Sequence, residues 1–218
     1  MKRPELIIFD LDGTLLDTLE SIATSYNKAL IACGYRPHPV EDFLTIIGDG
    51  SRIAAQRCLP KDRQKESEIV RCVELFQQNY ALLWHTATPY QGIEKLLAEL
   101  RPEQKLAVLS NKRNDYTKLC IEHFFPNVFQ KVLGHGPKIR HKPEPDGANK
   151  LVSDLKASKK STWLVGDTAT DMKTASASGI IGIGALWGFR EKSELVSSGA
   201  KKVVSRPLQL LELLELLN

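Results

Sequence analysis

The chain has 218 residues, which is enough for one large domain or for a core domain with a smaller inserted one. Hydrophobic residues make up 42% and charged residues 26%, a profile typical of soluble globular proteins, and no apolar stretch is long enough to span a bilayer. The net charge of +4 is mild and is not gathered into a basic arm or stripe, so we expect neither nucleic-acid binding nor a membrane partner.

The cysteines and the N-terminal segment argue against further classes of protein, namely zinc-binding, disulfide-rich and secreted proteins. None of the four cysteines forms a C-x-x-C pair, which argues against a zinc site or a disulfide framework. The apolar run Leu6-Ile7-Ile8-Phe9 is too short for a signal peptide, and no small-residue cleavage site follows it. We therefore expect a cytoplasmic protein.

The first predicted element is a strand at residues 6–9. A short, continuous apolar run is typical of a strand that is buried on both faces in a parallel sheet. Asp10 follows it directly, at the carboxyl end of the strand, where open α/β sheets bind their ligands.

A helical segment follows the first strand. Asp17-Thr18-Leu19-Glu20 has the spacing of a capping box, and apolar residues recur at helical spacing from Ile22 to Cys33. Further helical patterns follow at 41–47, 51–58 and 64–83, and no strand pattern interrupts them. We therefore predict an all-helical domain at residues 18–85, inserted after the first strand.

Strand patterns then alternate with helical ones to the end of the chain. The expected strands are 106–109, 128–132 (the weakest), 163–165, 180–183 and 202–204, and the expected helices are 91–100, 114–124, 145–155, 168–178 and 207–217. This alternation predicts an α/β fold with a doubly wound parallel sheet. Its core domain would comprise residues 1–17 and 86–218.

The strongest chemical motif is Asp10-Leu11-Asp12-Gly13-Thr14-Leu15. Two carboxylates stand two residues apart at a strand end, beside a glycine that permits a tight turn and a close approach to a ligand. Neighbouring carboxylates need a cation or a shared proton to offset their repulsion. Mg²⁺ is the natural candidate because it prefers carboxylate, carbonyl, water and phosphate oxygens.

Three further clusters lie at predicted strand ends or in a loop. They are Ser110-Asn111-Lys112, the Lys142-Pro143 loop, and Gly166-Asp167 with Asp171. Each has an ordinary alternative as loop residues, a surface dipeptide or first-turn helix acids. Their joint occurrence favours a phosphoryl site, with phosphoryl oxygens bound by Ser110, Asn111 and Lys142.

Together these motifs resemble the haloacid dehalogenase-like hydrolases, and the resemblance covers nearly the whole chain. Within that family the chain looks most like the phosphoglycolate phosphatase branch, given D-L-D-G-T-L-L-D-T, Ile47-Gly48-Asp49-Gly50 and Ser110-Asn111-Lys112. The resemblance implies a core of the family's Rossmann-like type, a helical cap, and a Mg²⁺-dependent phosphatase that acts on a small phosphorylated metabolite, first of all 2-phosphoglycolate. A monomer or homodimer is expected.

The resemblance also implies roles for particular residues. Asp10 would attack phosphorus and form an aspartyl-phosphate, and Asp12 would serve as general acid and then general base. The metal would be held by the carboxylates of Asp10 and Asp167 and by the backbone carbonyl of Asp12. Asp171 would support the metal or Lys142 from outside the ligand set.

Several alternatives stay open. Inorganic pyrophosphate or small sugar phosphates could be the substrate, and a phosphomutase like β-phosphoglucomutase is disfavoured by Ile22, where those enzymes carry a histidine. A non-catalytic binding protein would not need Asp10, Asp12, Lys142 and Asp167 together. In the predicted cap, Arg52 follows a glycine-rich loop and could bind a substrate carboxylate or a second phosphate, or could simply be a solvated helix residue. His135 is a weaker candidate for substrate contact.

Overall fold

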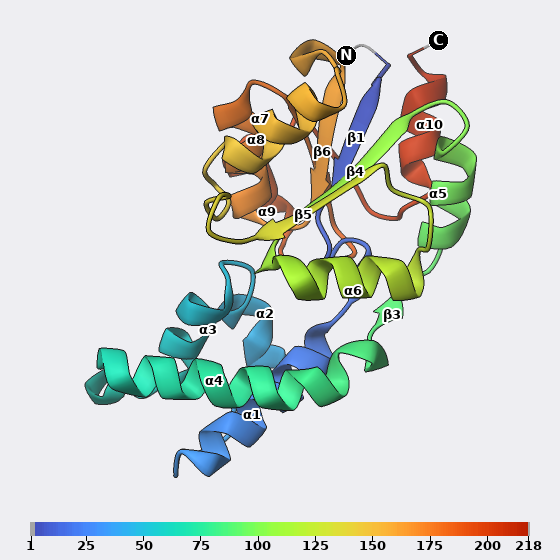
Figure 1. Ribbon diagram of the computed structural model, residues 1–218. Coiled ribbons are helices and arrows are strands. Elements are labelled where there is room, and N and C mark those ends of the chain that lie inside the picture. Colours follow the sequence, from blue (N-terminus) through green and yellow to red (C-terminus); the bar gives the residue numbers. More distant parts are fainter. Residues whose placement is uncertain (1–2, 218) are drawn as a thin grey trace. The chain divides into compact units, whose positions relative to one another are not determined.

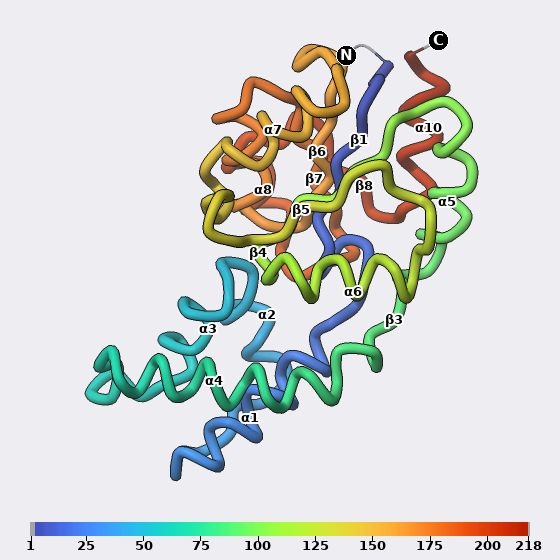
Figure 2. Tube along the Cα trace, viewed as in Figure 1, coloured from blue at the N-terminus to red at the C-terminus, as the bar shows by residue number. Residues whose placement is uncertain are grey.

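The computed structural model describes residues 3–217 and contains two compact units. The first unit runs up to Leu16 and resumes at Pro89, and the second comprises Asp17–Thr88. Figures 1 and 2 show the chain leaving the first unit after β1 and returning to it through β3. Within residues 3–217, no helix combines the length and the apolar character needed to cross a membrane.

The first unit is built on a six-stranded parallel sheet with the order β5-β4-β1-β6-β7-β8. The strands are β1 (Leu6–Phe9), β4 (Lys105–Arg113), β5 (Lys131–His135), β6 (Thr162–Gly166), β7 (Ile181–Ala185) and β8 (Lys202–Val204). The predicted α/β fold with a parallel sheet is therefore confirmed. The strand order reverses at β1, which lies between β4 and β6, and such a switch point is where α/β sheets bind ligands.

Helices pack against the sheet, and the burial that results is why its strands are apolar. They are α5 (Ile93–Leu100), α6 (Asn114–Phe124), α7 (Asp146–Asp154), α8 (Ala169–Ser178), α9 (Lys192–Ser197) and α10 (Gln209–Glu215). Every residue of β1 is fully buried. Leu6 and Ile8 join a core cluster with Leu151 of α7 and Ala175 of α8. Burial on both faces of β1 is why its sequence is continuously apolar rather than alternating.

Three local features differ from the sequence predictions. The strand expected at 128–132 is displaced to Lys131–His135, because Asn127 turns the chain with a φ of 59° and pairing with β4 begins only at Lys131. Helix α9 was not predicted. A small two-stranded sheet, β2 (Leu16–Asp17) with β3 (Thr88–Pro89), was also missed, because two residues are too short for a strand pattern.

The second unit is helical. Its helices are α1 (Leu19–Ala32), α2 (Phe43–Ile46), α3 (Ser51–Cys58) and α4 (Glu66–Leu83), with 3₁₀ turns between and after them at Val40–Asp42, Lys61–Arg63 and Trp84–Thr86. Tyr26 of α1 stacks on Phe76 of α4 with ring centroids 4.0 Å apart. These buried rings join the two longest helices of the unit.

The capping box predicted at residues 17–20 is wrong. Thr18 is the N-cap of α1, but its side chain makes no capping hydrogen bond. The backbone N–H of Leu19 instead donates to Asp17 Oδ1 over 3.2 Å. The predicted acceptor, Asp17, thus lies one residue before the N-cap, so the helix starts one residue later than the spacing indicated.

Candidate active site

Three adjacent strand ends converge at one edge of the sheet. Asp10 directly follows β1, Ser110 lies in the last part of β4, and Asp167 directly follows β6. Phe9 pairs with Val108 on one side and with Val165 on the other, so Asp10, Ser110 and Asp167 lie within one residue of the same level along their strands. All three are buried. Parallel strands thus bring together residues that lie up to 157 positions apart in the sequence.

Lys142 completes this cluster from the loop before α7. Its Nζ lies 2.8 Å from Asp10 Oδ1 and 2.6 Å from Asp171 Oδ1, and the residue is only 4% exposed. Burial alone would lower the pKa of Lys142, but the two carboxylates outweigh it and hold the pKa above its ordinary value. The lysine is therefore a fixed positive charge between two acids.

When ionised, the buried acids carry more negative charge than Lys142 offsets. Burial raises the pKa of Asp10 from 3.8 to about 7, with Lys142 acting against this shift and Asp171 and Asp12 adding to it. Burial also raises the pKa of Asp167 well above its usual value, and the neighbouring Asp171 and Asp10 raise it further. One lysine does not offset these carboxylates, so the cluster favours binding of a further cation.

The donor set fits a hard divalent metal ion. Asp10, Asp167 and Asp171 each offer a carboxylate oxygen, and these oxygens lie within 4.8 Å of one another. Carboxylate oxygens are ligands that Mg²⁺ prefers, and two positive charges would offset the surplus described above. The structure thus brings together the predicted ligands Asp10 and Asp167 with Asp171.

Hydrogen bonds already fix the orientation of Asp171. Its Oδ1 accepts from Lys142 Nζ, and its Oδ2 accepts from the Thr168 backbone N–H and hydroxyl at 3.1 and 2.7 Å. Thr168 and Asp171 form the capping box of α8. Both oxygens of Asp171 are therefore engaged, which suits a residue that orients its neighbours.

Asp167 is held by two residues that are not among the predicted site residues, Thr14 and Phe189. Thr14 Oγ1 donates to its Oδ1 at 3.0 Å, and the Phe189 backbone N–H donates to its Oδ2 at 2.9 Å. Gly13 and Gly188 lie so close that a Cβ on either would collide with the Asp167 side chain. The loop after β7 thereby encloses Asp167, and no local sequence signal marks Gly188 or Phe189 for this position.

Asn111 contacts the lysine loop. Its Nδ2 donates to the Lys142 carbonyl at 3.1 Å, and its Oδ1 accepts from the Lys142 N–H at 2.7 Å. This reciprocal pair ties the end of β4 to the backbone of Lys142. The Asn111 side chain thus positions the backbone of Lys142, and its contact with a phosphoryl group stays a prediction.

Asp12 forms a separate ion pair at the same edge. Its Oδ1 accepts a hydrogen bond from Lys112 Nζ, and the two side chains are 19% and 8% exposed. Lys112 belongs to the Ser110-Asn111-Lys112 cluster, but its partner could not be deduced from the sequence.

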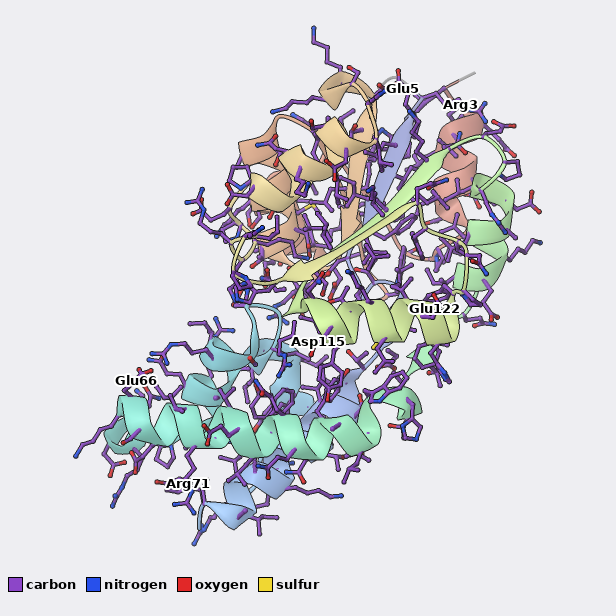
Figure 3. The ribbon with its side chains drawn as sticks, viewed as in Figure 1. Arg3, Glu5, Glu66, Arg71, Asp115 and Glu122 are labelled. Atoms are coloured by element: carbon purple, nitrogen blue, oxygen red, sulfur yellow. The ribbon has the colours of Figure 1, made fainter. Side chains whose placement is uncertain are left out.

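Two further candidates, Arg52 and His135, contact other residues of their own units. Arg52 of α3 donates from both terminal nitrogens to Glu66, at 2.6 and 2.5 Å, and both side chains are exposed; Figure 3 shows Glu66 at the start of α4. His135 stacks on His141 with ring centroids 3.5 Å apart, and its Nδ1 lies 3.1 Å from the Ile139 carbonyl oxygen.

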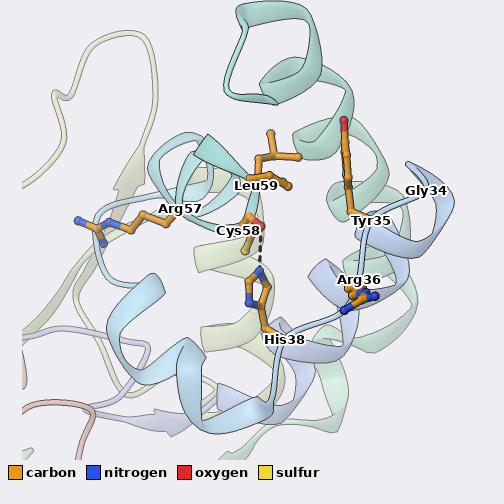
Figure 4. Close-up of a pocket in the computed structure, with 8 residues that line it drawn as sticks. Gly34, Tyr35, Arg36, His38, Arg57, Cys58 and Leu59 are labelled. Carbon is orange, nitrogen blue, oxygen red and sulfur yellow. Dashed lines mark hydrogen bonds between the residues drawn. The ribbon is translucent and has the colours of Figure 1, made fainter. Parts of the chain in front are cut away.

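The helical unit has a pocket of its own, with a volume of about 380 Å³ (Figure 4). It lies between the segment after α1 and the end of α3. His38 Nε2 is 2.8 Å from the Cys58 carbonyl oxygen, and the Tyr35 hydroxyl donates to Glu68. None of the predicted site residues lines this pocket.

A family model for haloacid dehalogenase-like hydrolases matches residues 7–185. The phosphoglycolate phosphatase of Aquifex aeolicus is 30% identical over 213 residues, which cover 96% of this chain and 96% of the relative. That of Vibrio parahaemolyticus is 27% identical over 95% of each chain.

A solved structure also resembles this chain in both fold and sequence. A protein of Lactobacillus delbrueckii subsp. bulgaricus, provisionally named a phosphoglycolate phosphatase, superimposes with a TM-score of 0.92 at 31% identity. The match covers 98% of this chain and 99% of that one.

Proposed function

Because this chain is a phosphatase of the haloacid dehalogenase-like hydrolase family, we propose that it hydrolyses a small phosphomonoester, 2-phosphoglycolate, with Mg²⁺ as cofactor. The observation that carries the proposal is the ion pair of Lys142 with Asp10 and Asp171 at the switch point of the sheet. The names of the relatives support the choice of substrate. A pyrophosphate or a sugar phosphate is the alternative substrate.

In the proposed reaction, a carboxylate oxygen of Asp10 attacks phosphorus, and the bond from phosphorus to the ester oxygen breaks. Asp12 gives a proton to the departing alcohol and then takes one from the water that attacks the aspartyl-phosphate. Hydrolysis returns the free Asp10 carboxylate and releases inorganic phosphate. The raised pKa of Asp10 indicates that its nucleophilic, ionised form depends on added positive charge.

The remaining residues would neutralise and position the phosphoryl group. We assign Ser110 and Lys142 to its oxygens, and Asn111 supports this site by holding the backbone of Lys142. Mg²⁺, when bound by the Asp10 and Asp167 carboxylates and the Asp12 carbonyl, would supply charge stabilisation to the transferred group. Asp171 orients Lys142. The domain boundaries, the cytoplasmic location and the monomeric or homodimeric state stay predictions.

The test is phosphate release from a panel of phosphorylated metabolites, with and without Mg²⁺. We expect release to require the metal, to stop on addition of EDTA, and to show the highest kcat/KM for 2-phosphoglycolate. Metal-independent release, or none from any ester, would contradict the proposal. Transfer of the phosphoryl group to a sugar hydroxyl instead of water would favour a mutase.

We also propose Arg52 as a specificity residue of the helical unit. Its guanidinium is held bidentately by Glu66, so a substrate anion would have to compete with that carboxylate. Arg52→Ala should raise KM several-fold for an acidic ester and spare a neutral one such as p-nitrophenyl phosphate. Equal kinetic effects on the two esters would remove this role.

A further inference from the structure

The ion pair between Lys112 and Asp12 places a second nearly buried ammonium group in the sheet unit. Lys112 lies two residues beyond Ser110 in β4, and its backbone N–H donates to Ser110 Oγ at 3.2 Å. The lysine therefore stands next to a residue that we assigned to the phosphoryl group. Its ammonium reaches the residue that we assigned to the leaving alcohol.

The charges of this edge divide into two groups. Lys142 is bound between Asp10 and Asp171, so it serves the side where the phosphoryl group would be transferred. Lys112 is bound to Asp12, so it serves the side from which the alcohol would depart. An anionic group on that alcohol would approach Asp12, and repulsion between the two anions would oppose binding unless a cation lay beside them.

We propose that Lys112 is a specificity-determining residue that binds an anionic group, of the carboxylate class, on the leaving alcohol. This inference rests on the proposed function, because Asp12 faces the alcohol only if Asp10 accepts the phosphoryl group. When the substrate binds, the Lys112 ammonium exchanges the Asp12 carboxylate for the carboxylate of the substrate. Its positive charge is therefore paired with a negative one before and after binding. The Asp12 side chain is then released toward the ester oxygen. A neutral ester offers no carboxylate for this exchange.

Burial makes Lys112 better suited to this role than a surface cation. Its side chain is 8% exposed, whereas that of Arg52 is 53% exposed and tied to Glu66. An ion pair that is shielded from water is weakened less by solvent and salt than an exposed one. Lys112, in the last part of β4, should therefore contribute more than Arg52 to the preference for an acidic ester over a neutral one.

The test compares 2-phosphoglycolate with its neutral amide, which has nearly the same shape but lacks the carboxylate. Lys112→Met removes the charge at similar length, Lys112→Arg keeps it, and Lys118→Met is the control on the exposed face of α6. We expect Lys112→Met to lower the ratio of kcat/KM for the acid over the amide at least about tenfold. Lys112→Arg should retain most of that ratio, and Lys118→Met should retain all of it.

Binding provides a second readout. In an Asp10→Asn background, calorimetry should show weaker binding of 2-phosphoglycolate after Lys112→Met, and a much smaller change for the amide. Lys112→Gln replaces the methionine variant if the latter melts below the assay temperature. An unchanged ratio, or an equal loss for both esters, would overturn the inference. Failure of the proposed function gives a different result, because the unmodified protein would then release no phosphate from either ester.

Discussion

Asp10→Asn should abolish turnover while the protein stays folded. The change removes the proposed nucleophile and keeps the size of a side chain that is fixed by Lys142 and the Leu11 N–H. Loss of a nucleophile in a concerted site costs many orders of magnitude, so we expect kcat to fall by at least about 10⁴-fold. Phosphate release under saturating Mg²⁺ measures this, and Asp154→Asn on α7 is a matched exposed control.

The pH dependence of stability tests whether the charge of Asp10 is the cause. Without metal, Asp10 has a pKa of about 7 in the folded protein instead of 3.8, so between these values the folded state retains a proton that the unfolded chain has released. The free energy of unfolding must then fall as the pH rises from about 4 to about 7. Asp10→Asn does not show this fall, because asparagine does not titrate. In EDTA, the Tm of Asp10→Asn should exceed the Tm of the unmodified protein, and this difference in Tm should grow from pH 4 to pH 7.

Two results would contradict this account of Asp10. If the difference in Tm between Asp10→Asn and the unmodified protein stays constant with pH, the buried Asp10 carboxylate is not the cause of the pH-dependent stability. Near-native turnover by the asparagine variant would remove Asp10 from its proposed role altogether.

Lys142→Met should lower both stability and turnover. The methionine fills a similar volume, but it leaves Asp10 and Asp171 buried without their shared cation. Removing one partner of a buried ion pair costs roughly 3–5 kcal/mol because the other charge remains uncompensated. Losing a preorganised charge that faces the phosphoryl group should lower kcat by a further factor of about 10²–10³.

Urea denaturation and phosphate release would measure the two losses separately. Lys150→Met, at an exposed ion pair on α7, is the control and should change stability by less than about 1 kcal/mol. The stability loss in Lys142→Met should shrink at acid pH, because Asp10, whose pKa burial raises to about 7, is then protonated and no longer needs a cation. If the methionine variant is as stable and as active as the control, Lys142 does not hold the site together.

Local patterns were enough to predict the sheet and the order of its motifs. The burial of β1 on both faces is encoded in four consecutive apolar residues, and Asp10 follows them directly. Because parallel strands end at one edge, the motifs after β1, β4 and β6 had to approach one another once the alternation of strands and helices was recognised. Short or irregular elements such as β2 and β5 lack a repeated pattern and were missed or misplaced.

The sequence by itself determined the strands of the sheet other than β5, the polar residues at their ends, and therefore the kind of chemistry that this edge can support. Only the tertiary structure decided the partners within that edge: Asn111 with the Lys142 backbone, Lys112 with Asp12, and Phe189 with Asp167. The physical reason is the range of the forces involved. Burial periodicity acts over a few residues and can be read locally, whereas these pairings join residues 22 to 100 positions apart and exist only after the crossovers have formed.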